Sequence, residues 1–300
     1  MNIITKVESF FIFIITMKNY LLHIVISLIA FSLSYLLAYS TGLSLVQDTV
    51  LIVFAIQWVL FIPAYLFRTE KFFDLAGSVT YIFAVSFVFY KSNDDLLSYD
   101  IGSLILSMVI IFWALRLGSF LFLRIKKDGE DKRFRKIKPS FTRFFMTWTL
   151  QGTWVSMCLL CVLTAISSNY GIVVNLTFFV GLLLFAFGFG LEVVADSQKS
   201  RFRRDPKNKD LFIASGLWAL SRHPNYLGEL TLWVGVATMS FSSLSGLQYL
   251  TLVSPVFIYI LLVYISGVRI LEDSGRKKWG HLEAYKSYLN NTPKLFIKVF

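Results

Sequence analysis

The chain has 300 residues, of which 56% are hydrophobic and 16% charged, and its mean hydropathy is +0.66. This composition excludes an ordinary soluble domain and is typical of a polytopic membrane protein. The formal net charge is +11. Since no solvated domain is visible to present that charge to a polyanion, we expect no nucleic-acid partner. We attribute the basic residues to membrane topology and to attraction of a charged cofactor.

Apolar segments of roughly 20 residues, the length that a bilayer-spanning helix needs, recur along the whole chain. They occupy residues 20–39, 49–67, 72–90, 101–123, 144–166, 172–195, 225–244 and 247–267. The segment 225–244 differs from the others because Glu229 lies in it, and an earlier apolar run at 10–16 is too short to span. The sequence therefore predicts an all-α, polytopic transmembrane helical bundle with about seven or eight crossings.

The distribution of charge predicts the orientation. Lys and Arg gather in three segments separated by pairs of crossings, at residues 125–140, 196–223 and 267–298. The positive-inside rule places these segments and both termini in the cytosol. The loops expected on the opposite side are acidic, with one Lys91 against Asp48, Asp94, Asp95 and Asp100. We expect an integral multi-pass protein, of the endoplasmic reticulum if eukaryotic or the inner membrane if bacterial, with no obligate protein partner.

The most informative stretch runs from Gly190 to Glu229. If its first half continues the preceding helix, offsets of four, three and four put four ionisable residues on one helical face. They are Glu192, Asp196, Lys199 and Arg203. Such a group at the mouth of a membrane helix suggests a site for a charged ligand. Arg and Lys suit phosphates, whereas carboxylates accept hydrogen bonds from ribose hydroxyls and a carboxamide.

The second half places donors, acceptors and aromatic faces within a dozen residues, and Pro224 is expected to set His223 at a helix N-terminus. The combined motifs read Gln198-Lys199-x-x-Phe202-Arg203, Trp218 and Arg222-His223-Pro224-Asn225-Tyr226-x-Gly228-Glu229. They resemble the C-terminal half of the steroid 5-alpha-reductase and sterol-reductase superfamily, most closely the branch often called DUF1295. The resemblance extends from about Phe141 to Leu295, with a further phrase at Phe73–Tyr81.

The resemblance implies a membrane enzyme that uses NADPH to reduce a carbon–carbon double bond of a steroid-, sterol- or fatty-enone-like lipid taken from the bilayer. It implies a cofactor pocket in residues 141–300 and a substrate cavity in residues 1–140. The residues then expected to bind the cofactor are Glu192, Asp196, Lys199, Arg203, Trp218, Arg222, His223, Asn225, Tyr226, Glu229, Arg269, Glu272 and Asp273.

Candidates for the chemistry lie earlier in the chain. Tyr81 is the candidate proton donor, and Asp74, seven residues before it on the same helical face, is either its polarising carboxylate or a helix-capping residue. Gln57 and Gln151 are polar groups at membrane depth and are candidates for substrate binding, although Gln151 could equally bond a neighbouring helix. Steroid reductases use a glutamate where only Gln57 is found here.

Two other functions stay open. Isoprenylcysteine and phospholipid methyltransferases share the R-H-P-x-Y-x-G core and bind S-adenosylmethionine, which carries no phosphate. The Gln198–Arg203 motif favours the reductase because it supplies charge for phosphates. A non-catalytic scaffold or lipid-binding protein is the third possibility.

We expect no metal site, since Cys158 and Cys161 lie in an apolar segment without a second pair of metal-binding residues. A Rossmann site is not expected, since Gly188 and Gly190 lie late in an apolar helix.

Overall fold

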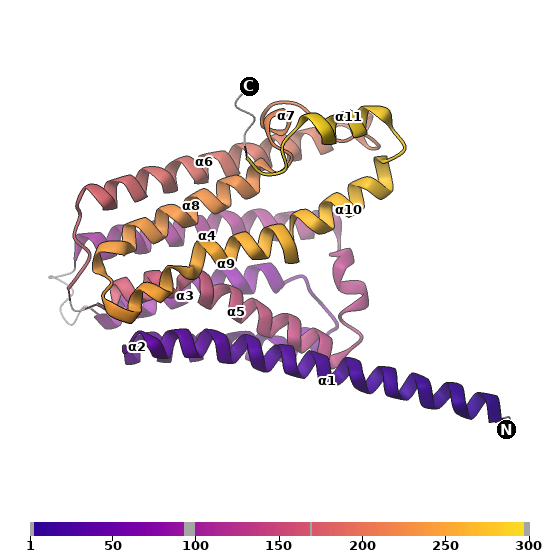
Figure 1. The fold of residues 1–300 in the computed structure, drawn as a ribbon, viewed down its shortest axis with the longest axis horizontal. Helices are drawn as coiled ribbons and strands as arrows, with labels where there is room; N and C mark the ends of the chain where they lie inside the picture. The colour runs from indigo at the N-terminus through magenta and orange to yellow at the C-terminus, as the bar shows by residue number, and fades with distance from the viewer. Residues whose placement is uncertain (1–2, 93–99, 169, 297–300) are drawn as a thin grey trace. The chain divides into compact units, whose positions relative to one another are not determined.

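The computed structural model describes residues 3–92, 100–168 and 170–296, with the side chains of the first helix from Met17 onward (Figure 1). Within that part of the chain all regular structure is helical, which confirms the predicted fold class. Asp94, Asp95 and the last basic residue, Lys298, lie outside the described residues.

The chain divides into two compact units. The first comprises residues 1–171 together with Ser245–Thr251, and the second comprises Ile172–Leu244 and Leu252–Phe300. The helices of the first unit are α1(Ile3–Ser40), α2(Ser44–Leu66), α3(Phe73–Ser92), α4(Ile101–Asp128), the 3₁₀ turn η1(Lys132–Lys136) and α5(Phe141–Ile166). Those of the second are α6(Leu176–Arg204), η2(Pro206–Asn208), α7(Leu217–Leu220), α8(Pro224–Ser240), η3(Phe241–Ser243), α9(Ser254–Ile260), the π-helical η5(Leu261–Ile265), α10(Val268–Trp279) and α11(Glu283–Asn291). The 3₁₀ segment η4(Gly246–Val253) passes from one unit to the other.

Helix α5 forms the core of the first unit. It packs against α1, α2 and α3, and every residue from Val155 to Ile166 is buried. A helix that is apolar all round is suited to such a position, because no polar face has to be exposed. Gly152 allows the close approach of α2, since a Cβ atom there would lie 2.8 Å from the Phe54 ring. The division by compactness therefore places α5 with the N-terminal helices, whereas the expected functional division at residue 140 stays a prediction.

Polar side chains mark where several of these helices begin. Asp100 accepts hydrogen bonds from the backbone nitrogens of Gly102 and Ser103 at the start of α4. Asn175 accepts one from Phe178 at the start of α6. These caps satisfy backbone N–H groups that have no partner within the first turn of a helix. The apolar segments are thus bounded by residues that fix the helix register.

The second unit is built on a close pair of helices, α6 and α8, which run side by side in Figure 1. Two glycines on each helix, Gly181 and Gly188 on α6 and Gly228 and Gly235 on α8, face the partner helix. A Cβ atom at Gly188 would lie 2.4 Å from the backbone nitrogen of Leu232, and one at Gly181 would lie 2.6 Å from the carbonyl oxygen of Gly235. Small residues at such a contact allow backbones to approach closely within a membrane. Because Gly188 meets Gly228 whereas Gly181 meets Gly235, the two helices are antiparallel.

Seven helices of the described chain are long and apolar enough to cross a membrane. Helix α8 has 17 residues and is not among them, but it returns antiparallel along α6 over the same depth. Adding it gives an eighth crossing, within the predicted range. The last predicted span, 247–267, is not one regular helix. It consists of a 3₁₀ segment, α9, a π-helical turn and a break at Gly267, where a Cβ atom would lie 2.3 Å from the carbonyl oxygen of Leu262.

Candidate functional site

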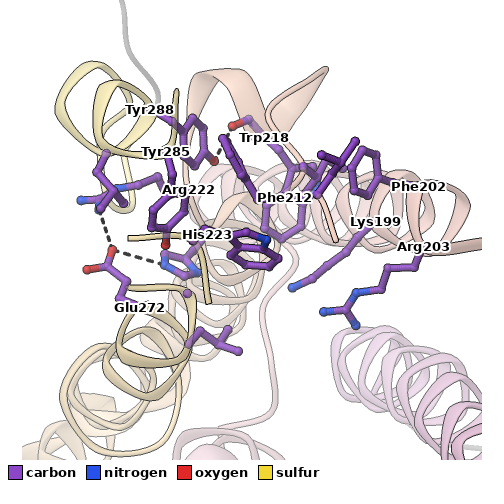
Figure 2. Close-up of a pocket in the computed structure, with 16 residues that line it drawn as sticks. Lys199, Phe202, Arg203, Phe212, Trp218, Arg222, His223, Glu272, Tyr285 and Tyr288 are labelled. Atoms are coloured by element: carbon purple, nitrogen blue, oxygen red, sulfur yellow. Dashed lines mark hydrogen bonds and ion pairs between the residues drawn. The ribbon is translucent and has the colours of Figure 1, made fainter. Parts of the chain in front are cut away.

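A pocket lies in the second unit between the C-terminal end of α6 and helix α10. It encloses about 140 Å³ and, with its open mouth, about 730 Å³ of empty space. Figure 2 shows the side chains of Lys199 and Arg203 on one side, the pair Arg222–Glu272 on the other and aromatic rings between them. The lining residues are Lys199, Phe202, Arg203, Leu211, Phe212, Ile213, Trp218, Arg222, His223, Leu271, Glu272, Gly275, Trp279, Tyr285, Tyr288 and Leu289.

The cations on α6 reach the pocket because α6 continues well beyond its apolar part, to Arg204, as the sequence predicted. Lys199 and Arg203 are one helical turn apart in its last two turns and so project from the same side. The ammonium group of Lys199 lies 4.6 Å from the centre of the Trp218 ring, in a cation–π contact. Trp218 is itself fixed, because its indole nitrogen donates to the carbonyl oxygen of Ala195 at 3.1 Å.

Aromatic side chains from three segments form the wall. The ring of Phe212 lies 5.0 Å from that of Tyr285 and 5.4 Å from that of Tyr288, while Trp279 lies 5.8 Å from Tyr285. The Tyr288 hydroxyl donates to the carbonyl oxygen of Trp218 at 2.8 Å, and burial raises the pKa of Tyr288 to about 12, so this hydroxyl stays protonated. The wall is therefore a fixed set of flat faces suited to an aromatic heterocycle.

The opposite side of the pocket holds a buried ion pair. Arg222 Nη1 lies 2.9 Å from Glu272 Oε1, with only 13% and 11% of the two side chains exposed. His223 Nε2 lies 3.6 Å from the same oxygen. Burial lowers the pKa of His223, although the Glu272 carboxylate opposes this effect, so His223 is neutral at pH 7.

Three buried nitrogens on this side have no hydrogen-bond partner among the described residues. They are Arg222 Nε and both ring nitrogens of His223, of which Nε2 lies nearest to Glu272. Leaving a buried donor or acceptor without a hydrogen bond costs roughly 1–3 kcal/mol. A ligand in the pocket would remove this cost by hydrogen-bonding these atoms.

The segment Leu211–Ile213, which follows the basic end of α6, forms the part of the pocket wall beside α10. The indole nitrogen of Trp279 donates to the carbonyl oxygen of Asp210 at 2.6 Å, and Lys278 Nζ donates to that of Lys209 at 3.0 Å. These bonds hold Lys209 and Asp210 against α10. Gly216, with a φ of +62°, then turns the chain into α7, and its close neighbour Gln198 accepts a hydrogen bond from Leu217 at 3.0 Å.

Six of the expected cofactor-binding residues line this pocket: Lys199, Arg203, Trp218, Arg222, His223 and Glu272. The others lie elsewhere in the second unit. Glu192 and Asp196 are buried along α6, and Asn225 Nδ2 donates to Asp196 Oδ1 at 3.3 Å. The Tyr226 ring stacks on that of His223 at 5.7 Å but is not part of the pocket lining. Glu229 is buried within α8, whereas Arg269 and Asp273 are exposed on α10.

His223 is the N-cap residue of α8 and Pro224 its first residue, which confirms the position expected from the sequence. Phe212 was not foreseen as a site residue. Its only signal in the sequence is the short apolar triplet Leu211–Ile213 after a strongly basic run, and that triplet does not show what the ring contacts. Trp279, Tyr285 and Tyr288 also line the pocket, although they were not among the residues expected to bind the cofactor.

The candidates for the chemistry lie in the first unit. Tyr81 is buried, with its ring edge-on to Trp113 at 5.1 Å, and an Asp74 carboxylate oxygen lies 4.0 Å from Arg124 Nη2. Seven helical residues correspond to about 10 Å of rise, so Asp74 does not hydrogen-bond Tyr81 directly.

Both glutamine amides in this unit serve contacts between helices. Gln57 Nε2 donates to Thr80 Oγ1 at 2.8 Å, and Gln151 Nε2 donates to the carbonyl oxygen of Phe73 at 2.7 Å. Their Oε1 atoms are buried without a hydrogen-bond partner among the described residues. Each amide therefore keeps an acceptor, while its role in substrate binding stays a prediction.

Among the described residues, no group of three or more His, Cys, Asp or Glu side chains is arranged to hold a metal ion. The chain has no match among curated proteins and none among solved structures. The profile of one family, described as "Protein of unknown function (DUF1295)", matches residues 58–292. This match includes α3, α5, the α6–α8 pair and the whole pocket, and covers most of the chain. The protein is therefore a member of the DUF1295 family.

Proposed function

We propose that the protein is a membrane-embedded reductase that uses NADPH to reduce a carbon–carbon double bond of a steroid-, sterol- or fatty-enone-like lipid. The observation that carries the proposal is the composition of the pocket in the second unit. Three cations, Lys199, Arg203 and Arg222, line it together with a wall of aromatic rings and one carboxylate, Glu272. This combination fits a ligand that joins several phosphates to aromatic heterocycles.

The residues present fit this cofactor. Lys199 and Arg203 are placed to bind phosphate oxygens, and Arg suits a phosphate because its guanidinium donates two parallel hydrogen bonds. Phe212, Tyr285 and Tyr288 offer faces on which a ring can stack. Arg222 Nε and His223 Nδ1 offer a donor and a ring nitrogen without a protein partner. When bound, NADPH supplies the hydride, and the chain's part is to hold and orient the cofactor and to exclude water.

Each group on the Glu272 side has a distinct part. The Arg222–Glu272 pair holds both side chains in fixed positions, because each satisfies the charge of the other in a buried site. Neutral His223 can donate a hydrogen bond from one ring nitrogen and accept at the other without adding charge. Proton delivery to the substrate is assigned to Tyr81 in the first unit, as the sequence predicts.

An S-adenosylmethionine-dependent methyltransferase is the second candidate, because it shares the Arg222–Glu229 motif. S-adenosylmethionine carries a positive sulfonium and no phosphate. A pocket with three cations against one carboxylate is less suited to it than to a polyanion. The charge of the lining therefore favours the reductase.

The test is ligand-induced stabilisation of the detergent-solubilised full-length protein. NADPH should raise Tm, because a ligand that binds only the folded state stabilises it. NADH should raise it much less, since it lacks the 2′-phosphate. Stabilisation by S-adenosylmethionine without a response to NADPH would overturn the proposal in favour of the methyltransferase.

A pair of variants on the same helix sharpens this test. Arg203→Ala should weaken NADPH binding by about 2–3 kcal/mol, or some 30- to 150-fold, because a charge-assisted contact is lost. Arg201→Ala is the matched control, because Arg201 is exposed on α6 and does not line the pocket. Equal losses in the two variants would show that net charge, and not the pocket, attracts the cofactor.

A further inference from the structure

A second basic pocket lies in the first unit, between the end of α2 and the start of α5. It has a volume of about 440 Å³ and is lined by Arg68, Arg135, Lys138 and Pro139. Three of its four lining residues are cations. The proposed cofactor site, which belongs to the second unit, makes no use of this pocket.

Arg68 is held in a set orientation. Its backbone has a φ of +50°, in the left-handed region that side chains other than glycine rarely adopt. Its guanidinium stacks 4.1 Å above the Tyr65 ring, and Nη1 donates to the carbonyl oxygen of Lys138 at 2.7 Å. Nη2 donates to the Tyr65 hydroxyl at 3.2 Å. A strained backbone kept in place by such contacts is more typical of a binding site than of a loose surface turn.

A buried carboxylate ties the two sides of the pocket together. Glu70, only 2% of whose side chain is exposed, forms an ion pair with Lys138. It also accepts a hydrogen bond from the backbone nitrogen of Asp131 at 3.0 Å. The turn after α2 and the segment before α5 therefore hold each other, so the pocket is a preformed feature.

The cations differ in how far their charge is balanced. Lys138 is paired with Glu70, and Arg135 with the half-buried Glu130. The described contacts of Arg68 are to carbonyl oxygens, a hydroxyl and a ring, which carry no formal charge. A guanidinium has five N–H donors, and these contacts leave Nε of Arg68 for an outside acceptor. Arg68 is therefore the cation to which an anion would bind.

The pocket lies at the depth where membrane helices end. Arg68 follows the last residue of α2 by two positions, and Lys138 precedes the first residue of α5 by three. Both helices are candidate membrane spans. Exposed apolar side chains flank the cations, with Phe67 79% exposed and Phe141 51%. A ligand here would thus meet charge at one end and hydrocarbon at the other.

We propose that this pocket binds the phosphate of an anionic phospholipid in the surrounding leaflet. The Arg68 guanidinium binds the phosphate, Arg135 and Lys138 add positive potential, and the acyl chains lie along Phe67 and Phe141. By the positive-inside rule this face is expected on the cytosolic side, where anionic lipids are common. The exposed apolar rim favours a lipid over a soluble phosphate as the source of the anion.

The test is native mass spectrometry of the full-length protein with phosphatidylglycerol or phosphatidylcholine of the same acyl chains. We expect one phosphatidylglycerol to bind at least about tenfold more tightly than phosphatidylcholine. Arg68→Gln should lower the phosphatidylglycerol affinity about tenfold, through loss of a charge-assisted contact. Arg135→Gln should lower it severalfold without disturbing the fold, since 61% of the Arg135 side chain is exposed.

Lys127→Gln is the matched control, because it removes the same charge from an exposed position in the last turn of α4 and outside the pocket. It should leave the affinity within about twofold. Equal binding of the two lipids, or equal losses in Lys127→Gln and Arg68→Gln, would overturn the proposal. Displacement of phosphatidylglycerol by millimolar inorganic phosphate would also overturn it, because the pocket would then serve a soluble anion.

Discussion

His223 combines deep burial with a position beside the Arg222–Glu272 pair. Burial lowers its pKa below the ordinary value of 6.5. As the pH falls through 6.5, the unfolded chain therefore takes up a proton that the folded chain does not. The free energy of unfolding should decrease on acidification for this reason, and the loss should continue until the pH reaches the folded-state pKa.

The dependence of stability on pH can be measured as the change in Tm between pH 7.5 and pH 5.5 in detergent. His223→Gln should show a smaller change than the wild type, because the group that titrates differently in the two states is gone. His281→Gln removes an exposed histidine and should behave as the wild type. An unchanged pH dependence in His223→Gln would show that another group is responsible.

A substitution at Tyr81 tests the proposed proton transfer separately from cofactor binding. Tyr81→Phe keeps the ring and its edge-on contact with Trp113 but removes the hydroxyl. On an accepted enone lipid we expect turnover to fall roughly a hundredfold, the lower end for loss of a general acid, with NADPH affinity within about twofold. Tyr39→Phe, the same change at an exposed position of α1, should have no effect. Full turnover in Tyr81→Phe would mean a different proton donor, and Asp74→Asn would then be the next variant to measure.

At the scale of single helices, the pattern along α6 shows what a sequence can and cannot predict. The offsets of Glu192, Asp196, Lys199 and Arg203 predict one face, but only the last two line the pocket. The first two lie under α8, where Gly228 meets the Glu192 backbone and Asn225 donates to Asp196. Periodicity gives the side of a helix on which a residue lies, but it does not show which neighbour covers that side. For the same reason the aromatic wall around Phe212 could not be derived, since it joins segments about 70 residues apart.

Because of the α6–α8 contact, alanine substitutions at two nearby glycines of α6 should change the stability of the protein in opposite directions. Gly188→Ala should destabilise the protein by about 1–3 kcal/mol, because its Cβ atom would meet the backbone of Leu232, which cannot move aside as a side chain can. Gly190→Ala has no atom within 4 Å of its Cβ and should stabilise the helix by about 0.5–1 kcal/mol. Tm values in one detergent would compare them. If both variants shifted Tm in the same direction, the close packing of the two helices would be refuted.

For the whole molecule, the pocket constrains the topology. The C-terminal end of α6 and helix α10 both line it, so they lie on the same side of the membrane. An even number of crossings must therefore separate them, and α8 together with the 246–279 span provides two. The apolar segments alone predicted this count, and the shared pocket adds to the antiparallel α6–α8 contact a second structural reason to include α8.

The topology can be tested with single cysteines. Glu130→Cys, Lys207→Cys and Asn290→Cys should all react with an impermeant maleimide from the same side, expected to be the cytosol. Asp48→Cys, at an exposed position near the start of α2, should react only from the opposite side. The native Cys158 and Cys161 are fully buried and should give no background. Reaction of Lys207→Cys and Asn290→Cys from opposite sides would exclude α8 as a crossing.

The glycine-lined contact between α6 and α8 also bears on how the chain enters the membrane during synthesis. Helix α8 has only 17 residues and carries Asn225 and the buried Glu229, so its free energy of insertion as a lone segment is unfavourable compared with the longer spans. Helix α6 is synthesised first, and α8 can pack against its glycine-lined surface as soon as α8 has been made. We therefore expect the two helices to leave the insertion machinery as a hairpin, with α6 retained at the exit until α8 has been made.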